Sequence, residues 1–170
     1  MKNITTFKMA MDAYNIGDYE VALRTLRILA EQGEVEAQFN LGLMYEEGEG
    51  VTQDDKEAAK WYQLAAEQGD ADAQYNISYM YYDGHGVIQN YREAAKWCRL
   101  AAEQGDADAQ YNLSICYHEG QGVEMNLDEA NYWYTKAIEQ DNTAASDVKY
   151  FEDQKNVINF EYWKKSPRKK

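Results

Sequence analysis

The sequence predicts an all-α fold, a right-handed α-solenoid of stacked antiparallel helix pairs. Three observations support this class. Residues 35–70, 71–106 and 107–142 align without gaps, and the first two copies agree at 21 of 36 positions. Each copy contains two stretches with apolar residues at helical spacing, and the whole chain holds one proline. A fixed period of this length indicates units that pack on their neighbours rather than around one globular core.

Residues 1–34 are predicted to form a helix pair with a shorter connection than the later copies have. Residues 6–15 have a helical pattern, and residues 16–19, Ile-Gly-Asp-Tyr, lead directly into a second helix. The Gly-x-Gly-Val insertion of the later copies is missing here. Terminal units of a solenoid are expected to differ from the internal ones in this way.

The first helix of each copy, helix A, is predicted over residues 36–47 in the first copy. Its apolar residues recur at i, i+4, i+7 and i+8, which places them on one helical face: Ala37, Leu41, Met44 and Tyr45. Gly48 follows at the position of a left-handed C-cap. A short loop then leads to the second helix.

The second helix, helix B, is predicted to begin at the N-cap Asp54, with Glu57 completing a capping box. The same pattern returns at residues 90–93 and 126–129. Small and large residues then alternate where helices must approach closely: Ala58, Trp61 and Ala65, followed by Ala94, Trp97, Ala101, Ala130, Trp133 and Ala137. We interpret the tryptophans as core residues rather than as a ladder for a cofactor or a sugar, because they share this helical spacing.

These residues resemble the Sel-one-like repeat, a relative of the tetratricopeptide repeat. The pattern Ala-x-x-x-Leu-Gly-x-x-Tyr-x-x-Gly-x-Gly-Val, then Ala-x-x-Trp and Ala-Ala-x-x-Gly, is carried by Ala37, Leu41, Gly42, Tyr45, Gly48, Gly50, Val51, Ala58, Trp61, Ala65, Ala66 and Gly69. The resemblance covers residues 35–142 and implies a tetratricopeptide-like superhelix. Ser78 and Ser114 replace the glycine of helix A, an exchange of small residues that we expect to cost little.

The domain organisation that follows is one solenoid. It begins with a tetratricopeptide-like helix pair and continues through three repeats, a capping helix and a basic tail: residues 1–34, 35–70, 71–106, 107–142, 143–163 and 164–170. The capping helix is predicted from apolar residues at helical spacing, namely Val148, Phe151, Val157 and Phe160. The last repeat ends in Asn142, and asparagine tolerates the left-handed conformation of a C-cap.

The composition favours a cytoplasmic protein with basic protein partners. The chain carries 17 basic and 30 acidic residues, a formal net charge of −13. An acidic body repels nucleic acid and attracts cationic partners, although many acidic surfaces serve only solubility. Neither a membrane span nor a signal-peptide core is found, and two cysteines are too few for a disulfide scaffold. We expect no nucleic-acid partner, and a monomer is favoured.

By resemblance to tetratricopeptide arrays, the A helices line a concave groove, and their groove-facing positions are the candidate partner-binding residues. Tyrosines give contact area at low entropic cost. Asparagine side chains one repeat apart can form hydrogen bonds with the backbone of an extended peptide. The alternative is that they bond to the adjacent A helix. Carboxylates at the rim either steer a basic partner or form solvated helix ends. The candidates are Phe39, Asn40, Leu43, Glu47, Tyr75, Asn76, Tyr79, Tyr82, Asp83, Tyr111, Asn112, Ile115, His118 and Glu119, with Glu46 as a further variable position.

No catalytic, cofactor-binding or metal-ligating set is predicted. Residues 48–50 are not a dinucleotide loop, because no strand precedes them. Cys98, Cys116, His85 and His118 lack the spacing of metal ligands. The secreted, cysteine-rich members of the resembled family pair cysteines on helices A and B of one repeat. The position of Cys98 argues against that disulfide framework and against the penicillin-binding activity attributed to some of those members.

The leading hypothesis is a non-catalytic, bacterial-type interaction module that binds one protein or peptide partner in the concave groove. Its sharper form is an acidic immunity or inhibitor protein that neutralises a basic toxin. The alternative is a structural or assembly scaffold that acts through self-association, and a hydrolase of the cysteine-rich family type is less favoured.

Overall fold

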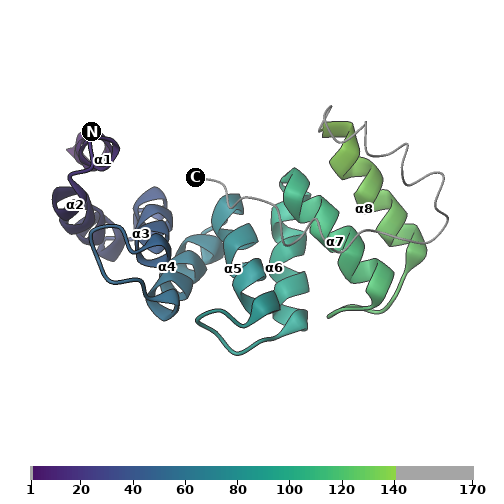
Figure 1. The fold of residues 1–170 in the computed structure, drawn as a ribbon. Coiled ribbons are helices and arrows are strands. Elements are labelled where there is room, and N and C mark those ends of the chain that lie inside the picture. Colours follow the sequence, from purple (N-terminus) through teal and green to yellow (C-terminus); the bar gives the residue numbers. More distant parts are fainter. Residues whose placement is uncertain (1, 141–170) are drawn as a thin grey trace. The chain divides into compact units, whose positions relative to one another are not determined.

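Residues 2–140, the part of the chain that the computed structural model describes, form eight α-helices and no strand (Figure 1). This confirms the predicted all-α class of helix pairs. In chain order the helices are α1 (Lys2–Asn15), α2 (Tyr19–Glu31), α3 (Val35–Glu47), α4 (Asp55–Glu67), α5 (Ala71–Asp83), α6 (Tyr91–Glu103), α7 (Ala107–Glu119) and α8 (Leu127–Gln140).

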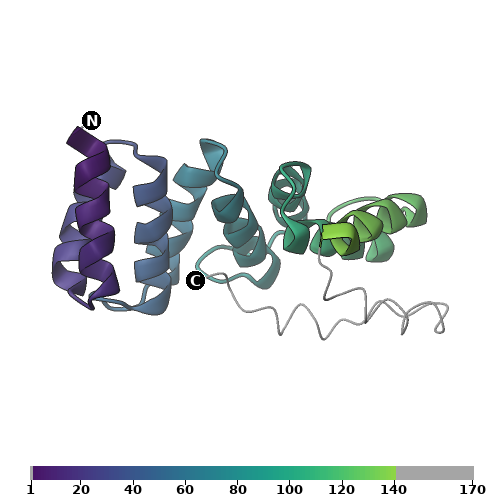
Figure 2. The same ribbon diagram turned by 90° about the horizontal axis from the view of Figure 1, so that it is seen from above.

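The helices belong to two units, which are described separately. The first unit ends at Asn90 and contains α1–α5, and the second begins at Tyr91 and contains α6–α8. Within the first unit each helix packs on the next one in sequence, from α1 to α5 (Figure 2). Within the second unit α7 packs on both α6 and α8. The helices α3, α5 and α7 are the A helices of the three repeats, and α4, α6 and α8 are their B helices.

Two kinds of connection join helix A to helix B. Residues 16–18 join α1 to α2, where Gly17 has a positive φ of 80° and Asp18 caps α2 through the amide of Val21. The repeats use the longer connection that the sequence predicts. Gly48 ends α3 in the left-handed region, with φ 72° and its N–H bonded to the carbonyl of Met44. Gly84 and Gly120 end α5 and α7 in the same way.

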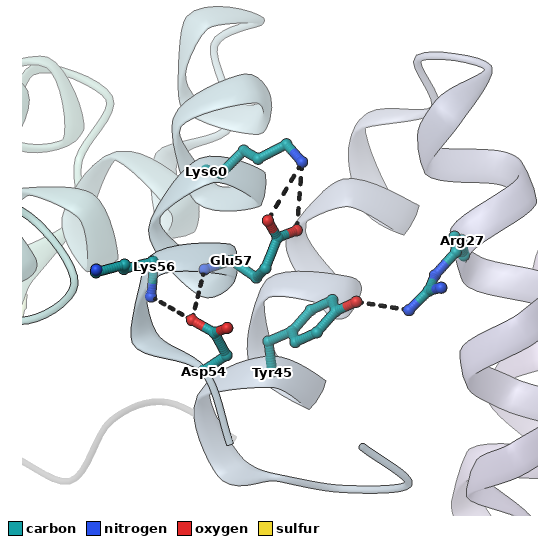
Figure 3. Close-up of polar contacts among 6 residues, drawn as sticks. All are labelled: Arg27, Tyr45, Asp54, Lys56, Glu57 and Lys60. Carbon is teal, nitrogen blue, oxygen red and sulfur yellow. Dashed lines mark hydrogen bonds and ion pairs between the residues drawn. The ribbon is translucent and has the colours of Figure 1, made fainter. Parts of the chain in front are cut away.

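The start of helix B shows that the predicted capping box is only half formed. Asp54 accepts hydrogen bonds from the amides of Lys56 and Glu57 at 3.0 and 3.2 Å, as predicted (Figure 3). The N–H of Asp54 does not bond to Glu57, however, but donates to the carbonyl of Tyr45 at 2.9 Å. Helix A itself therefore satisfies the N-cap amide, and Glu57 is left to pair with Lys60 at 3.3 Å.

The core consists of the alanines and tryptophans that the sequence singles out. Ala58 and Ala65 have no exposed surface, and Trp61, Trp97 and Trp133 are 8%, 7% and 9% exposed. The interpretation of the tryptophans as core residues is thus confirmed. Methyl-sized contacts let neighbouring helices approach closely, while each indole fills the space beside them.

At the helix A position where the later repeats have serine, the first repeat has Gly42 in close contact with an aromatic ring. A Cβ atom at Gly42 would lie 2.7 Å from ring carbons of Tyr62, which packs directly on α3. Ser78 and Ser114 are accommodated in their own repeats, where each hydroxyl donates to the carbonyl three residues earlier, at 2.8 and 2.6 Å.

A buried glutamine ties successive B helices together, a role that the sequence reasoning did not assign. Gln38 donates through Nε2 to the carbonyl of Ala30 at 3.1 Å, and its Oε1 accepts from Gln68 at 2.7 Å. Gln110 makes the same two bonds, to Ala102 at 3.0 Å and from Gln140 at 2.8 Å. Each carbonyl also accepts from the N–H of a glycine, Gly33 or Gly105, at 3.0 Å, so the glutamine adds a second bond to the end of α2 or α6 and is itself bonded by a residue at the end of α4 or α8.

Three predictions for the C-terminal end concern residues outside the described part of the chain: the turn at residues 141 and 142, the capping helix 143–163 and the basic tail 164–170. Among the described helices, none combines the length and the apolar character needed to cross a membrane.

Candidate interaction surface

Charge is divided between the two kinds of helix. The A helices α3, α5 and α7 contain no lysine or arginine. Eight of the ten Lys and Arg residues between positions 2 and 140 lie on α2 and the B helices: Arg24, Arg27, Lys56, Lys60, Arg92, Lys96, Arg99 and Lys136. The acidic residues of the A helices are Glu36, Glu46, Glu47, Asp72, Asp83, Asp108 and Glu119. The A helices are therefore the purely anionic elements of the repeats.

In the first unit the candidate residues differ in their accessibility. Tyr75 and Asn76 are buried, each with 9% exposure. The other aromatic, aliphatic and amide candidates are half-buried, namely Phe39, Asn40, Leu43, Tyr79 and Tyr82, and the two carboxylates Glu47 and Asp83 are exposed.

In the second unit the candidates on α7 show the same gradation. Asn112 and Ile115 are buried, Tyr111 and His118 are half-buried, and Glu119 is exposed. Partial burial raises the pKa of Glu119, while the neighbouring His118 acts in the opposite direction. The carboxylate thus lies at the boundary between the packed helix and water.

The three asparagines, Asn40, Asn76 and Asn112, differ in their solvent exposure. Asn40 donates its amide to the carbonyl of Glu36, on its own helix, at 2.7 Å. Asn76 and Asn112 are buried, at 9% and 5% exposure. The three amides therefore do not form an evenly accessible row.

Aromatic contacts hold several candidate side chains in place. The rings of Phe39 and Tyr62 have centroids 5.8 Å apart, and those of Tyr79 and His85 are 6.2 Å apart. Tyr62 also donates its hydroxyl to Glu46 at 2.8 Å, and Glu46 is only 5% exposed. Glu46 is consequently part of the packed interior, and sequence reasoning had placed it among the groove-facing positions.

Arginine–tyrosine pairs are a further feature that sequence reasoning missed. Arg27 of α2 bonds to the hydroxyl of Tyr45 at 2.5 Å and lies 5.9 Å from the centre of its ring (Figure 3). Arg99 of α6 makes the same contacts with Tyr117. The constant separation of 18 residues was the signal in the sequence that would have revealed these pairs. These contacts engage one arginine of α2 and one of α6 within the fold.

The two cysteines are free and buried. Cys98 donates its thiol to the carbonyl of Ala109 at 3.1 Å, and burial raises the pKa of Cys116 to about 12. Among the described residues no three His, Cys, Asp or Glu side chains gather as metal ligands would.

Comparison with known proteins identifies the repeat. The model of the Sel1 repeat matches residues 35–70, 71–106 and 107–142. An exopolysaccharide production negative regulator of Rhizobium leguminosarum bv. viciae is 45% identical over 56 residues, which are 33% of this chain and 21% of that protein.

Two solved structures share the fold over most of the described chain. An SLR-fold protective antigen of uropathogenic Escherichia coli strains superimposes with a TM-score of 0.77 and 40% identity, over 81% of this chain and 30% of that one. A Sel1 repeat protein from Oxalobacter formigenes superimposes with a TM-score of 0.78 and 38% identity, over 89% of this chain and 63% of that one. The chain thus spans less than two thirds of each of these relatives.

Sel1 repeat proteins generally mediate protein–protein interaction and generally lack enzymatic activity. The repeat model covers more than half of the sequence, and the structural matches are strong. The chain therefore belongs to the Sel1 repeat family.

Proposed function

We propose that the chain is a non-catalytic interaction module that binds a basic protein or an extended basic peptide through its A helices. The observation that carries this proposal is the division of charge: α3, α5 and α7 hold acidic residues and no lysine or arginine. A cationic partner is attracted to these helices, whereas α4, α6 and α8 mix lysines and arginines with acidic residues. Such a field orients a partner and accelerates its association.

The contact in the first unit is proposed to combine apolar area with exposed charge. Half-buried side chains offer surface that is already fixed by packing, so that a partner orders few new rotamers. Carboxylates at the C-terminal ends of α3 and α5 face the same partner. The residues proposed are Phe39, Leu43, Tyr79 and Tyr82 for packing, and Glu47 and Asp83 for charge.

In the second unit α7 offers the corresponding set. Tyr111 and His118 are half-buried and Glu119 is exposed, above the buried Asn112 and Ile115. The proposal does not include a ladder of amides that binds a peptide backbone, because Asn40 bonds to its own helix. The buried side chains of Tyr75 and Asn76 are proposed to hold the half-buried candidate side chains of α5 in position.

Neutralisation of a basic toxin, such as a nuclease, is the narrower form of this proposal. Residues 2–140 hold ten Lys and Arg against 25 Asp and Glu, an acidic excess suited to such a partner. A toxin gene beside the gene for this chain would favour it, and purified chain would then inhibit that toxin. Cytoplasmic residence belongs to the same proposal, because free buried thiols fit a reducing compartment.

Photo-crosslinking tests the binding surface directly. A benzophenone amino acid is placed at Tyr79 or Tyr82 on α5, and at Leu64 on α4, which is 37% exposed, as the control. The proposal expects one protein to be captured from native cytoplasm at positions 79 and 82 and not at 64. Capture at 64 alone would move the site to the B helices.

Quantitative binding to the captured partner then separates contact from stability. Tyr82→Ala is expected to weaken binding by about tenfold to a hundredfold if the tyrosine is an anchor. Tyr132→Ala on α8 is the matched control, because Tyr132 is an exposed tyrosine on a B helix, at 53% exposure. Equal affinities of the two variants would contradict the proposal. Self-association, the alternative role, predicts a mass in light scattering that rises with concentration.

A further inference from the structure

In two repeats the tyrosine of the repeat pattern in helix A is covered by an arginine that lies 18 residues earlier in the chain. The guanidinium carbon of Arg27 lies 5.9 Å from the ring centre of Tyr45, and a terminal nitrogen donates to the hydroxyl at 2.5 Å (Figure 3). Arg99 donates to the hydroxyl of Tyr117 in the same way, with its guanidinium carbon 5.3 Å from the ring centre. Both tyrosines are buried, at 9% and 8% exposure. Each pair combines a cation–π contact with a hydrogen bond from a charged donor.

The second repeat has the tyrosine without the arginine. Tyr81 stands at the register of Tyr45 and Tyr117, and the residue at the position of the arginine is Gln63. Gln63 donates its amide to Glu67, on its own helix, at 2.9 Å. Among the described residues the Tyr81 hydroxyl has no hydrogen-bond partner, and the side chain is half-buried. The ring and the hydroxyl that bind a guanidinium in the other two repeats are therefore left without one here.

The surroundings of Tyr81 favour a cation. Tyr81 lies on α5, which packs on α4 within the first unit, and α5 contains two aspartates and no lysine or arginine. Glu67, the last residue of α4, is exposed and has no ion-pair partner within residues 2–140. The last turn of α4 holds no basic residue. A cation at this end of α4 is attracted by the carboxylate and by the helix dipole.

We propose that Tyr81 binds an arginine side chain of a partner, in the place that the chain's own arginines fill at the other two tyrosines. The guanidinium lies over the ring, donates to the hydroxyl and approaches the carboxylate of Glu67. Arginine is favoured over lysine, because its planar guanidinium stacks on a ring and donates at its edge at the same time. The proposal rests on the proposed function in one respect, namely that the arginine belongs to the basic partner. Tyr81 itself is not among the residues proposed for the contact on the A helices.

A peptide probe tests this site without the partner. The full chain, with isotope-labelled tyrosine rings, is titrated with acetyl-Gly-Arg-Gly-amide, and the magnetic resonance signal of Tyr81 is identified by its loss in Tyr81→Phe. We expect this signal to shift saturably, with a dissociation constant in the millimolar range. The same peptide with citrulline in place of arginine has a similar shape and no charge, and it is expected to bind about tenfold more weakly. No saturable shift, or equal affinities for the two peptides, would overturn the proposal.

Matched substitutions fill the site from within or open a second one. Gln63→Arg places an arginine at the register of the two existing pairs, and it is expected to abolish the response of Tyr81 to the peptide. Leu64→Arg is the control of equal charge, because Leu64 is exposed on the same helix, and it should retain most of the response. Arg27→Gln is expected to give Tyr45 a response to the same peptide. A Gln63→Arg chain that binds the peptide as wild type does would contradict the proposal.

The peptide and the partner together separate this proposal from the proposed function. A partner captured at Tyr79, combined with no response of Tyr81 to the peptide, would overturn the arginine site alone. A response of Tyr81 without any captured partner would support the arginine site and count against the proposed function. Where both hold, Gln63→Arg is expected to weaken binding of the partner by about tenfold, whereas Leu64→Arg is expected to change it by less than about threefold.

Discussion

The backbone of Gly86 lies directly against the carbonyl of Asp55, the first residue of the B helix in the preceding repeat. A Cβ atom at Gly86 would overlap that carbonyl oxygen, and φ at Gly86 is +67°. In the second unit Gly122 lies against the carbonyl of Tyr91 in the same way, with φ +73°. The second glycine of the Gly-x-Gly-Val loop is thus where each loop rests on the repeat before it.

Gly86→Ala is expected to destabilise the first unit by about 2–5 kcal/mol, the sum of a left-handed alanine and an overpacked contact with backbone. Gly69→Ala is the matched control, because Gly69 has φ +98° and nothing within 4 Å of an added Cβ. That control isolates the backbone term of roughly 1 kcal/mol. Chemical denaturation measures both variants. Equal losses of stability would show that the loop yields and that the contact is not required.

The sequence predicts the elements of this fold well because each element is determined by neighbouring residues. The spacing of Ala37, Leu41, Met44 and Tyr45 locates α3, and the left-handed Gly48 ends it as expected. The contacts between repeats were less visible. The overlap of Gly86 with Asp55 and the bond between Gln38 and Gln68 join residues 31 and 30 positions apart, and neither a glycine nor a glutamine indicates such a partner in the sequence.

The candidate surface was predicted less completely, because helical spacing gives the face of a residue but not its depth. Phe39 and Asn40 are half-buried, whereas Tyr75 and Asn76, at the same register positions of the next repeat, are buried. The burial of Glu46 depends on the hydroxyl of Tyr62, 16 residues away. This pair becomes apparent only when α3 and α4 are packed together. The charge division between helices, by contrast, was present in the sequence and becomes clear once helix bounds are known.

Gln38→Met is expected to lower the free energy of unfolding by about 0.5–1.5 kcal/mol, because it removes one of the two hydrogen bonds to the carbonyl of Ala30 and the bond from the amide of Gln68, at similar side-chain volume. Gln63→Met is the control, since the bond of Gln63 to Glu67 is exposed and its loss is expected to change stability by less than about 0.5 kcal/mol. Urea titrations followed by circular dichroism measure both. A Gln38→Met protein as stable as wild type would mean that the bonds contribute nothing net.

Lys60 and Trp61 compete for Glu57 in the first repeat. Glu57 pairs with Lys60, and the indole Nε1 of Trp61 is buried without a hydrogen-bond partner among the described residues. In the third repeat Tyr132 stands in place of the lysine, and Glu129 accepts from Trp133 Nε1 at 3.1 Å. Removal of Lys60 should therefore release Glu57 to the indole.

The exchange of partners for Glu57 is measured by a double-mutant cycle. Lys60→Ala alone is expected to change stability by less than about 0.5 kcal/mol, because the ion pair that it removes is exposed. Glu57→Gln should then cost about 0.5–1 kcal/mol more in the Lys60→Ala background than in wild type. The same cost in both backgrounds would show that Glu57 does not turn to Trp61. Tryptophan emission offers an independent readout of the same change.

The buried thiol of Cys116 makes stability depend on pH in the alkaline range. Burial raises its pKa from 9.0 to about 12, and the nearby Glu119 adds to the rise. A folded-state pKa above the unfolded value means that the stabilisation is complete below pH 9.0 and is lost as the pH rises toward 12. Cys116→Ser keeps a similar volume without this titration. The free energy of unfolding of wild type relative to Cys116→Ser should thus decrease above pH 9.0, by at most about 1.4 kcal/mol per pH unit. An advantage that stays constant across the range would contradict the shift, and a thiol reagent should modify Cys116 in denaturant but not in the native protein.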